Sequence, residues 1–298
     1  SHKPFASRHE PVSEILFAKR RYTGADRVQL VADVGGDPSA PAVILLHGGG
    51  QTRHSWGTAM HELVAQGFHV INLEARGHGD SGWSPDGDYS LATLSADLRA
   101  VIATLPALPA LVGASMGGAT ALYTVGNSPE PVARALVMVD IVPRVEREGG
   151  EKIGAFMRAN PQGFASLEEA ADVVAAYYPH RARPKDPSGL MKNLRKREDG
   201  RLYWHWDPRM IARSDNPEPP SFAKQLLAAC AGVKIPSLLV RGLNSDIVGE
   251  DGVREFRAAL PQLDVFDVFG AGHMVAGDKN DAFNEGVIAF LRRHPVPG

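Results

Sequence analysis

The sequence predicts an α/β fold with a mostly parallel central sheet that is flanked by helices and carries an inserted helical segment. Short apolar runs recur along the chain, and most are followed by a glycine-rich turn and a stretch with helical character. The runs do not alternate between apolar and polar residues, which is typical of strands buried on both faces of a parallel sheet. This rhythm stops between residues 144 and 232, where a separate helical unit is expected.

The strands and helices of the main sheet can be placed from these runs. Two strands are expected first, over residues 14–18 and 28–34, with turn-forming residues between them. Helices are expected over residues 91–105, where Ser90 is placed to cap the first turn, and over residues 250–260. Six apolar runs predict the remaining strands, over residues 42–46, 69–73, 110–112, 135–139, 237–240 and 264–268.

The interruption contains candidate helices of its own, at residues 151–159, 166–178 and 221–230. Ser166 and Glu169 have the spacing of a capping box at the start of the second. We interpret residues 144–232 as a lid inserted over the carboxyl edge of the sheet, so that residues 1–143 and 233–298 form the core domain. The alternative is that these helices belong to the main helical layer.

The composition excludes several classes of protein. A chain of 298 residues can bury a substantial core, and a formal net charge of −2 provides no basic surface for nucleic acid or anionic lipid. Cys230 is the only cysteine, which excludes an internal disulfide and a cysteine-based metal site. No apolar run has the length of a membrane span or of a signal peptide. We therefore expect a cytoplasmic protein, a monomer or small homo-oligomer, without membrane or nucleic-acid partners.

The segment Gly113-Ala114-Ser115-Met116-Gly117-Gly118 follows an apolar run and precedes a helical stretch. Small residues suit a sharp strand-to-helix turn, because they let the strand and the helix approach while the serine hydroxyl projects outward. The Gly-x-Ser-x-Gly pattern is weakly specific by itself, and its position between strand and helix gives it weight. Ser115 is therefore the candidate nucleophile.

A second glycine-rich turn, His47-Gly48-Gly49-Gly50, follows the run over residues 42–46. Such a turn can direct a backbone N–H at a carbonyl oxygen under attack, and the amide after the nucleophile supplies a second donor. We assign these roles to Gly49 and Met116, with Gly50 as the alternative to Gly49, and expect His47 to be a structural hydrogen-bonding residue behind the turn. No Gly-Lys-Ser/Thr follows, which excludes a phosphate-binding loop.

His273 is the candidate general base. It follows the last predicted strand, in Gly270-Ala271-Gly272-His273, where a loop can bring an imidazole to the serine hydroxyl. A buried carboxylate must orient that imidazole, and two aspartates follow strands of the sheet, Asp140 and Asp246. Their positions alone leave both open as the third member of the triad.

Together these motifs resemble the α/β-hydrolase superfamily, in order and approximate spacing, over nearly the whole chain outside the predicted lid. In that family the acid usually stands three residues beyond a glycine that ends the strand after the lid; counted from Gly242 this position is Ser245, and Asp246 is one place later. Some members carry the acid after the preceding strand, where Asp140 stands. The chain looks most like that branch, which includes bacterial ester hydrolases and a hydrolase of a ring-opened vitamin B6 catabolite. Asp140 is therefore preferred and Asp246 is the alternative.

The resemblance implies hydrolysis of a small-molecule carboxylic ester. Trp56, Trp204 and Trp206 are candidate substrate contacts, which predicts a small to medium substrate with an apolar or aromatic group, unless these aromatics form the core of the lid. No metal-ligand cluster and no nucleotide-binding motif occurs in the sequence, so neither a metal nor a cofactor is expected. The alternatives are hydrolysis of a lactone, an amide or a carbon–carbon bond, or perhydrolysis, on the same triad, and a non-catalytic small-molecule receptor.

Overall fold

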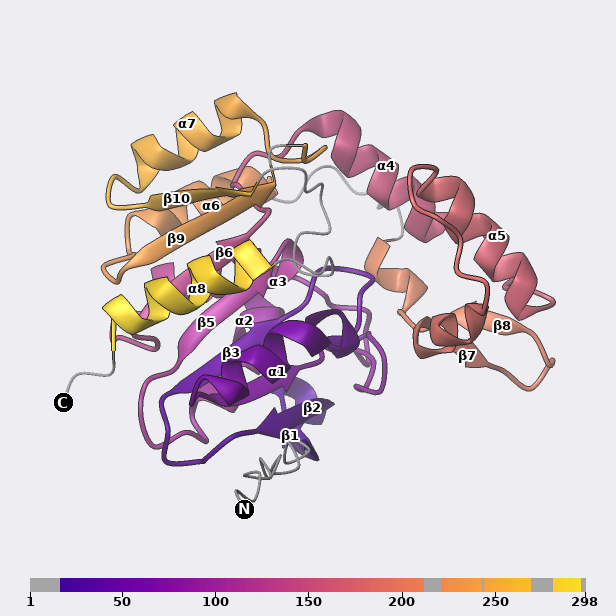
Figure 1. Cartoon of the computed structure of the whole chain (residues 1–298), viewed down its shortest axis with the longest axis horizontal. Helices are drawn as coiled ribbons and strands as arrows, with labels where there is room; N and C mark the ends of the chain where they lie inside the picture. The colour runs from indigo at the N-terminus through magenta and orange to yellow at the C-terminus, as the bar shows by residue number, and fades with distance from the viewer. Residues whose placement is uncertain (1–16, 212–220, 243, 269–280, 296–298) are drawn as a thin grey trace, which may run out of the picture.

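The computed structural model describes residues 17–211, 221–242, 244–268 and 281–295. Within these residues the main sheet has eight strands, in the order β1-β2-β4-β3-β5-β6-β9-β10 (Figure 1). β2 pairs antiparallel with β1 and β4, and the other neighbours are parallel. The strands are β1 (Ala18–Thr23), β2 (Gln29–Gly35), β3 (Ala42–Leu46), β4 (His69–Leu73), β5 (Ala110–Ala114), β6 (Ala135–Val139), β9 (Ser237–Gly242) and β10 (Asp264–Val268). The predicted mostly parallel sheet is confirmed.

The first strand differs from its prediction. β1 begins at Ala18, where the predicted strand ends, and its charged side chains Lys19, Arg20 and Arg21 are exposed. It lies at the edge of the sheet, where backbone pairing with β2 holds it in place and charged side chains discourage pairing with other molecules. An apolar pattern therefore could not reveal it.

Helices cover both faces of the sheet (Figure 1). In β3, Ile44 and Leu46 face one hydrophobic core, whereas Val43 and Leu45 face the other. Each such buried side chain contributes about 1.5–3 kcal/mol relative to an exposed one. Side chains of α2 (Leu91–Ile102), α3 (Met116–Gly126), α6 (Phe222–Cys230) and α7 (Glu250–Ala259) complete the first core, and those of α1 (Gly57–Ala65) and α8 (Asp281–Arg293) complete the second.

The helix starts predicted from capping residues are observed. The Ser90 hydroxyl accepts a hydrogen bond from the Thr93 amide at 3.3 Å, which satisfies an N–H of the first turn of α2. The Ser166 hydroxyl does the same for the Glu169 amide at 3.1 Å. Among the helices of the described residues, none is long and apolar enough to cross a lipid bilayer.

The described part of the predicted lid, residues 144–211, forms a unit with its own small hydrophobic core, and we call it the insertion. Figure 1 shows its helices and hairpin extending from one side of the sheet. Its elements are α4 (Arg147–Arg158), α5 (Leu167–Tyr177), the 3₁₀ helix η3 (Pro187–Asn193), the hairpin of β7 (Leu194–Lys196) and β8 (Leu202–Trp204), and the 3₁₀ helix η4 (Pro208–Ile211). The hairpin was not predicted, because its strands are three residues long and polar in part.

Helix α6 was predicted as part of the lid, within residues 144–232, but it lies in the main helical layer. Its Leu226 and Cys230 are buried in the same core as α2 and α3. Its backbone approaches α3 so closely that a Cβ added at Gly126 would lie 2.1 Å from the Ala229 carbonyl oxygen. For α6, the alternative interpretation therefore holds: it is a helix of the main layer. The insertion is correspondingly shorter than the predicted lid, residues 144–232.

Candidate active site

Ser115 lies in the corner between β5 and α3. Its backbone has φ 49° and ψ −114°, a region that non-glycine residues rarely adopt and that costs about 1–3 kcal/mol. The corner is tight: a Cβ added at Gly113 would lie 2.4 Å from the Gly117 carbonyl group, and one added at Gly117 would lie 2.3 Å from the Leu46 carbonyl oxygen. The two glycines of the motif are therefore required by close approach of backbone to backbone.

The turn after β3 lies beside this corner. A Cβ added at Gly48 would lie 3.4 Å from the Ser115 Cβ, and one added at Gly49 would lie 3.6 Å from the Met116 Sδ. The Gly48 N–H donates to Gln51 Oε1 at 3.0 Å, and the Gly50 N–H donates to His78 Nε2 at 2.9 Å. In the described part of the chain, the Gly49 N–H has no hydrogen-bond acceptor.

These contacts distinguish the predicted oxyanion donors. Since the Gly50 amide is already used by His78, Gly49 is the better placed of the two alternatives. Met116 is the first residue of α3, so its N–H has no partner within the helix and points out of the helix start. The structure thus brings Ser115, Gly49 and Met116 together.

His47 lies behind the turn and its imidazole is buried. Its Nδ1 is 2.8 Å from the Gly48 carbonyl oxygen, and its Nε2 accepts from the Ala75 amide at 3.0 Å. Burial lowers the pKa of His47, so the neutral ring makes both hydrogen bonds. This is the structural role predicted for His47, and it joins the oxyanion turn to the end of β4.

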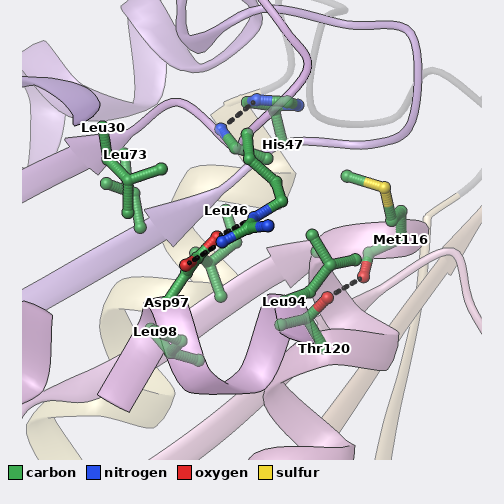
Figure 2. Close-up of a pocket in the computed structure, with 12 residues that line it drawn as sticks. Leu30, Leu46, His47, Leu73, Leu94, Asp97, Leu98, Met116 and Thr120 are labelled. Carbon is green, nitrogen blue, oxygen red and sulfur yellow. Dashed lines mark hydrogen bonds and ion pairs between the residues drawn. The ribbon is translucent and has the colours of Figure 1, made fainter. Parts of the chain in front are cut away.

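A buried ion pair joins Arg76 and Asp97 close to the site, and Figure 2 shows Asp97 in the same region as His47 and Met116. The Arg76 guanidinium donates to both carboxylate oxygens, at 2.6 and 2.9 Å, and its side chain is fully buried. His47, Met116 and these two charged residues line the same small cavity of about 30 Å³ (Figure 2). This pair could not be predicted from the sequence, because its members are 21 positions apart and only the fold brings them together.

The two candidate acids occupy different surroundings. Asp140 follows β6, whose neighbour is β5, and the Ser115 amide donates to the Val139 carbonyl at 2.9 Å. Asp140 is 1% exposed and has φ 52°, a left-handed conformation. Asp246 is exposed, and its backbone lies against Gly149 of α4. An orienting carboxylate has to be shielded from water, so burial favours Asp140.

Two further residues were predicted to belong to the site, His273 and Trp56. His273, the predicted base, lies outside the described residues. Trp56 is fully buried in the core between α1 and α8, with its ring 6.1 Å from that of Phe283, and it does not line the cleft described below. This prediction differs from the structure because the turn after β3 continues into a 3₁₀ helix, Arg53–Trp56, that directs the indole into the core.

A cleft of about 360 Å³ lies between the oxyanion turn and the insertion. Trp204 and Trp206 line it, with stacked rings 5.2 Å apart, and both indoles are mostly buried. They are also part of the small core of the insertion, so the two interpretations of these residues do not exclude each other. Gly49 and Gly50 also line the cleft, and Phe156, Met157, Tyr177 and Leu190 are among its further lining residues.

A second cavity, of about 450 Å³, adjoins the first inside the insertion. It lies between α5 and the chain that leads into η3. Five residues line both cavities: Val174, Tyr178, Gly189, Leu190 and Asn193. The cavity beside the turn after β3 and the cavity inside the insertion are therefore neighbours.

The fold and this arrangement can be compared with known proteins. A family model described as the alpha/beta hydrolase fold matches residues 41–279. The chain belongs to this family. It is 32% identical to esterase Rv0045c of Mycobacterium tuberculosis over 261 residues, which cover 85% of this chain and 83% of that protein. It is 31% identical to the sn-1-specific diacylglycerol lipase ABHD11 of Mus musculus over 267 residues, 86% of this chain and 82% of that one.

Solved structures agree with the family assignment. E-2-(acetamidomethylene)succinate hydrolase superposes with a TM-score of 0.79 at 24% identity, covering 93% of this chain and all of that one, which supports the fold. A crystal structure of esterase Rv0045c superposes with a TM-score of 0.72 at 29% identity, covering 93% of this chain and 92% of that one. The predicted α/β-hydrolase fold is confirmed, and the relatives support a hydrolase.

The sequence analysis missed the residues that attach the insertion of this hydrolase to its core. His205 and Asp207 are both buried and lie on either side of Trp206. The Asp207 carboxylate accepts from the Tyr89 hydroxyl at 2.6 Å, and its amide donates to the Gly77 carbonyl at 2.8 Å. The signal in the sequence is a histidine and an aspartate that alternate with tryptophans, because such polar residues need partners once their neighbours are buried.

Proposed function

We propose that this hydrolase cleaves carboxylic esters through an acyl-enzyme intermediate on Ser115. The observation that carries the proposal is the strained corner at Ser115, with the Gly49 and Met116 amides beside it. A strained nucleophile that is held next to amides without acceptors is typical of acyl transfer, where a negative charge develops on the carbonyl oxygen. The similarity of this chain to an esterase and to a lipase supports this reaction class.

In the proposed mechanism, Ser115 Oγ attacks the ester carbonyl carbon while His273 takes the hydroxyl proton. The Gly49 and Met116 amides bind the oxyanion of the tetrahedral intermediate. The intermediate collapses, and the alcohol leaves with the proton from His273. Water, deprotonated by His273, then attacks the acyl-enzyme and releases the carboxylic acid and free Ser115. Asp140 would hold the imidazole in the required tautomer.

The proposed substrate has an apolar acyl group of medium to large size. If Gly49 binds the carbonyl oxygen, the acyl group enters the cleft that Gly49 lines, next to Trp204 and Trp206. Burial raises the pKa of Tyr177, on the same cleft, to about 12, so its ring presents a neutral phenol. The shared lining residues allow the acyl group to continue into the second cavity.

The test begins with the nucleophile. A fluorophosphonate probe followed by peptide mass spectrometry should label Ser115, and Ser115→Ala should lose p-nitrophenyl ester hydrolysis. Undiminished hydrolysis by that variant would refute the proposal. A labelled Ser115 without turnover of any ester would indicate another acyl bond, and tight ligand binding without turnover would indicate a receptor.

The acid is tested by two matched substitutions. Asp140→Asn should lower kcat by about 10⁴, because the amide favours the wrong imidazole tautomer. Asp246→Asn should leave kcat within about twofold, since its side chain is exposed. The reverse pattern would assign the acid to Asp246.

A further inference from the structure

His205 of the insertion lies between two loops of the core domain. It follows β8 directly, and only 1% of its surface is exposed. The ring is near a second buried imidazole, His78, with ring centroids 5.8 Å apart. Nothing in the proposed reaction uses His205, although it lies next to the oxyanion turn.

Both ring nitrogens of His205 are hydrogen-bonded to backbone. Nδ1 accepts from the Gly79 amide at 2.8 Å, and Nε2 is 2.9 Å from the Gly50 carbonyl oxygen. Because Nδ1 accepts, the proton of the neutral ring is on Nε2, which donates to Gly50. Burial lowers the pKa of His205 to about 3, so this neutral form is present at any ordinary pH.

Gly50 is therefore held from two sides. Its N–H donates to His78 of the core, and its carbonyl accepts from His205 of the insertion. These two contacts fix the peptide groups on either side of the Gly50 Cα, which has φ 78°. The peptide group that precedes them carries the Gly49 amide, so its direction depends on how Gly50 is held.

Other hydrogen bonds attach the insertion to the core without reaching this turn. The Asp207 carboxylate binds the Tyr89 hydroxyl at 2.6 Å, and the Arg195 guanidinium binds Asp80 at 3.1 Å. The Arg209 guanidinium donates to the Ser84 carbonyl at 2.6 Å. They provide a comparison for His205, because they tie the same segment to the core at a distance from the proposed oxyanion site.

We propose that His205 is a positioning residue that holds Gly50, and through it the Gly49 amide, in the direction required to bind the oxyanion. The oxyanion site is then complete only while the insertion is docked on the core. This inference rests on the proposed function. It predicts an effect on kcat more than on KM, since the oxyanion forms after substrate binding and its hydrogen bonds are strongest in the transition state.

Three substitutions of His205 distinguish the effect of its hydrogen bond to Gly79 from the effect of its hydrogen bond to Gly50. His205→Ala removes both and should lower kcat by about 10- to 100-fold, with KM changed less than about threefold. The amide of His205→Asn reaches only the position of Nδ1, so it restores the contact to Gly79 and kcat should stay low. The amide of His205→Gln reaches the position of Nε2 and can donate to Gly50, so kcat should recover most of the loss.

Tyr89→Phe is the matched control. It removes the hydrogen bond between the core and Asp207 of the same segment, together with the one that the Tyr89 hydroxyl accepts from the Ser84 amide, but leaves both Gly50 contacts in place. It should lower Tm as the His205 variants do, with kcat unchanged. Circular dichroism identifies any variant that fails to fold, and the comparison of His205→Asn with His205→Gln then decides, because both keep an amide at this position.

Two results would overturn the inference. One is a folded His205→Ala or His205→Asn protein whose kcat stays within about twofold of the parent. The other is an equal loss of kcat in Tyr89→Phe, which would mean that general docking of the insertion controls the rate. The proposed function fails by a different result, an active Ser115→Ala protein, and that measurement does not involve His205.

Discussion

The two neighbouring cavities predict how activity depends on acyl chain length if the acyl group occupies both, and Gly189 is the position from which to test it. Gly189 lines both cavities. A Cβ added at Gly189 meets no atom within 4 Å, so a large side chain can be placed there without a backbone clash. Gly189→Trp should therefore fill part of the passage between the two cavities and leave the oxyanion turn undisturbed.

The expected magnitude follows from burial of methylene groups. Each buried CH₂ contributes about 0.8 kcal/mol, which corresponds to about a fourfold rise in kcat/KM. For p-nitrophenyl esters from acetate to dodecanoate, kcat/KM of the parent should rise by up to this factor per carbon until the chain fills both cavities, of about 360 and 450 Å³. In Gly189→Trp the rise should stop several carbons earlier, and acetate and butyrate should react at the parental rate.

Ser188→Trp is the control, since Ser188 is exposed and lines neither cavity. It adds the same indole one residue away and should keep the parental chain-length profile. If the profile of Gly189→Trp matches that of Ser188→Trp at every chain length, the acyl group does not use this passage.

Two further predictions concern stability. Asp97→Ala leaves the guanidinium of Arg76 buried without its main partner, so it should cost about 3–5 kcal/mol and lower Tm by roughly 6–15 °C; a calorimetric shift below about 2 °C would contradict this. Burial lowers the pKa of His205 from 6.5 to about 3. Between these two pH values the unfolded protein binds a proton at His205 that the folded protein does not bind, so the free energy of unfolding should fall as the pH decreases from about 6.5 to about 3. The free energy of unfolding can be measured by urea titration at pH 7 and at pH 4.5. Its decrease between the two should be smaller for His205→Gln than for the parent, by up to about 1.4 kcal/mol per pH unit. Equal decreases would show that His205 does not titrate in this range.

The parts of the fold that are visible in the sequence are those where burial dictates the residue type. The six apolar runs became β3, β4, β5, β6, β9 and β10, because strands covered on both faces have no room for polar side chains. The Gly113–Gly118 segment could be predicted equally well, since a Cβ added at Gly113 or Gly117 would lie only 2.3–2.4 Å from backbone atoms.

Other parts depend on contacts that no local pattern records. The hairpin of β7 and β8 is held by pairing of Arg195 with Tyr203, and the edge strand β1 by pairing with β2. Helix α6 has the amphipathic pattern of any surface helix, and only its packing against α3 assigns it to the main layer. Trp56 was placed in the cleft because it follows the turn in sequence, but a single 3₁₀ turn reverses the direction of its side chain.

Part of the candidate site could be predicted from the sequence, and part of it could not. Ser115, Gly49 and Met116 could be predicted to lie together, because glycine spacing reveals the turns at the strand ends where they stand. The burial that favours Asp140 over Asp246 could not be predicted from the sequence, because both aspartates follow strands. His205 and its partners lie more than 120 residues apart in the chain, so sequence spacing carried no sign of that contact.

The unusual backbone of Ser115 has a consequence for how robust the protein can become. A residue held at φ 49° and ψ −114° works against folding by about 1–3 kcal/mol, and glycine adopts this conformation with far less penalty. The strain therefore lowers the stability of the folded protein at the position of the proposed nucleophile. If Ser115 has that role, a Ser115→Gly protein should be inactive toward esters and should have a higher Tm than the parent, and selection for thermostability alone would tend to remove the serine.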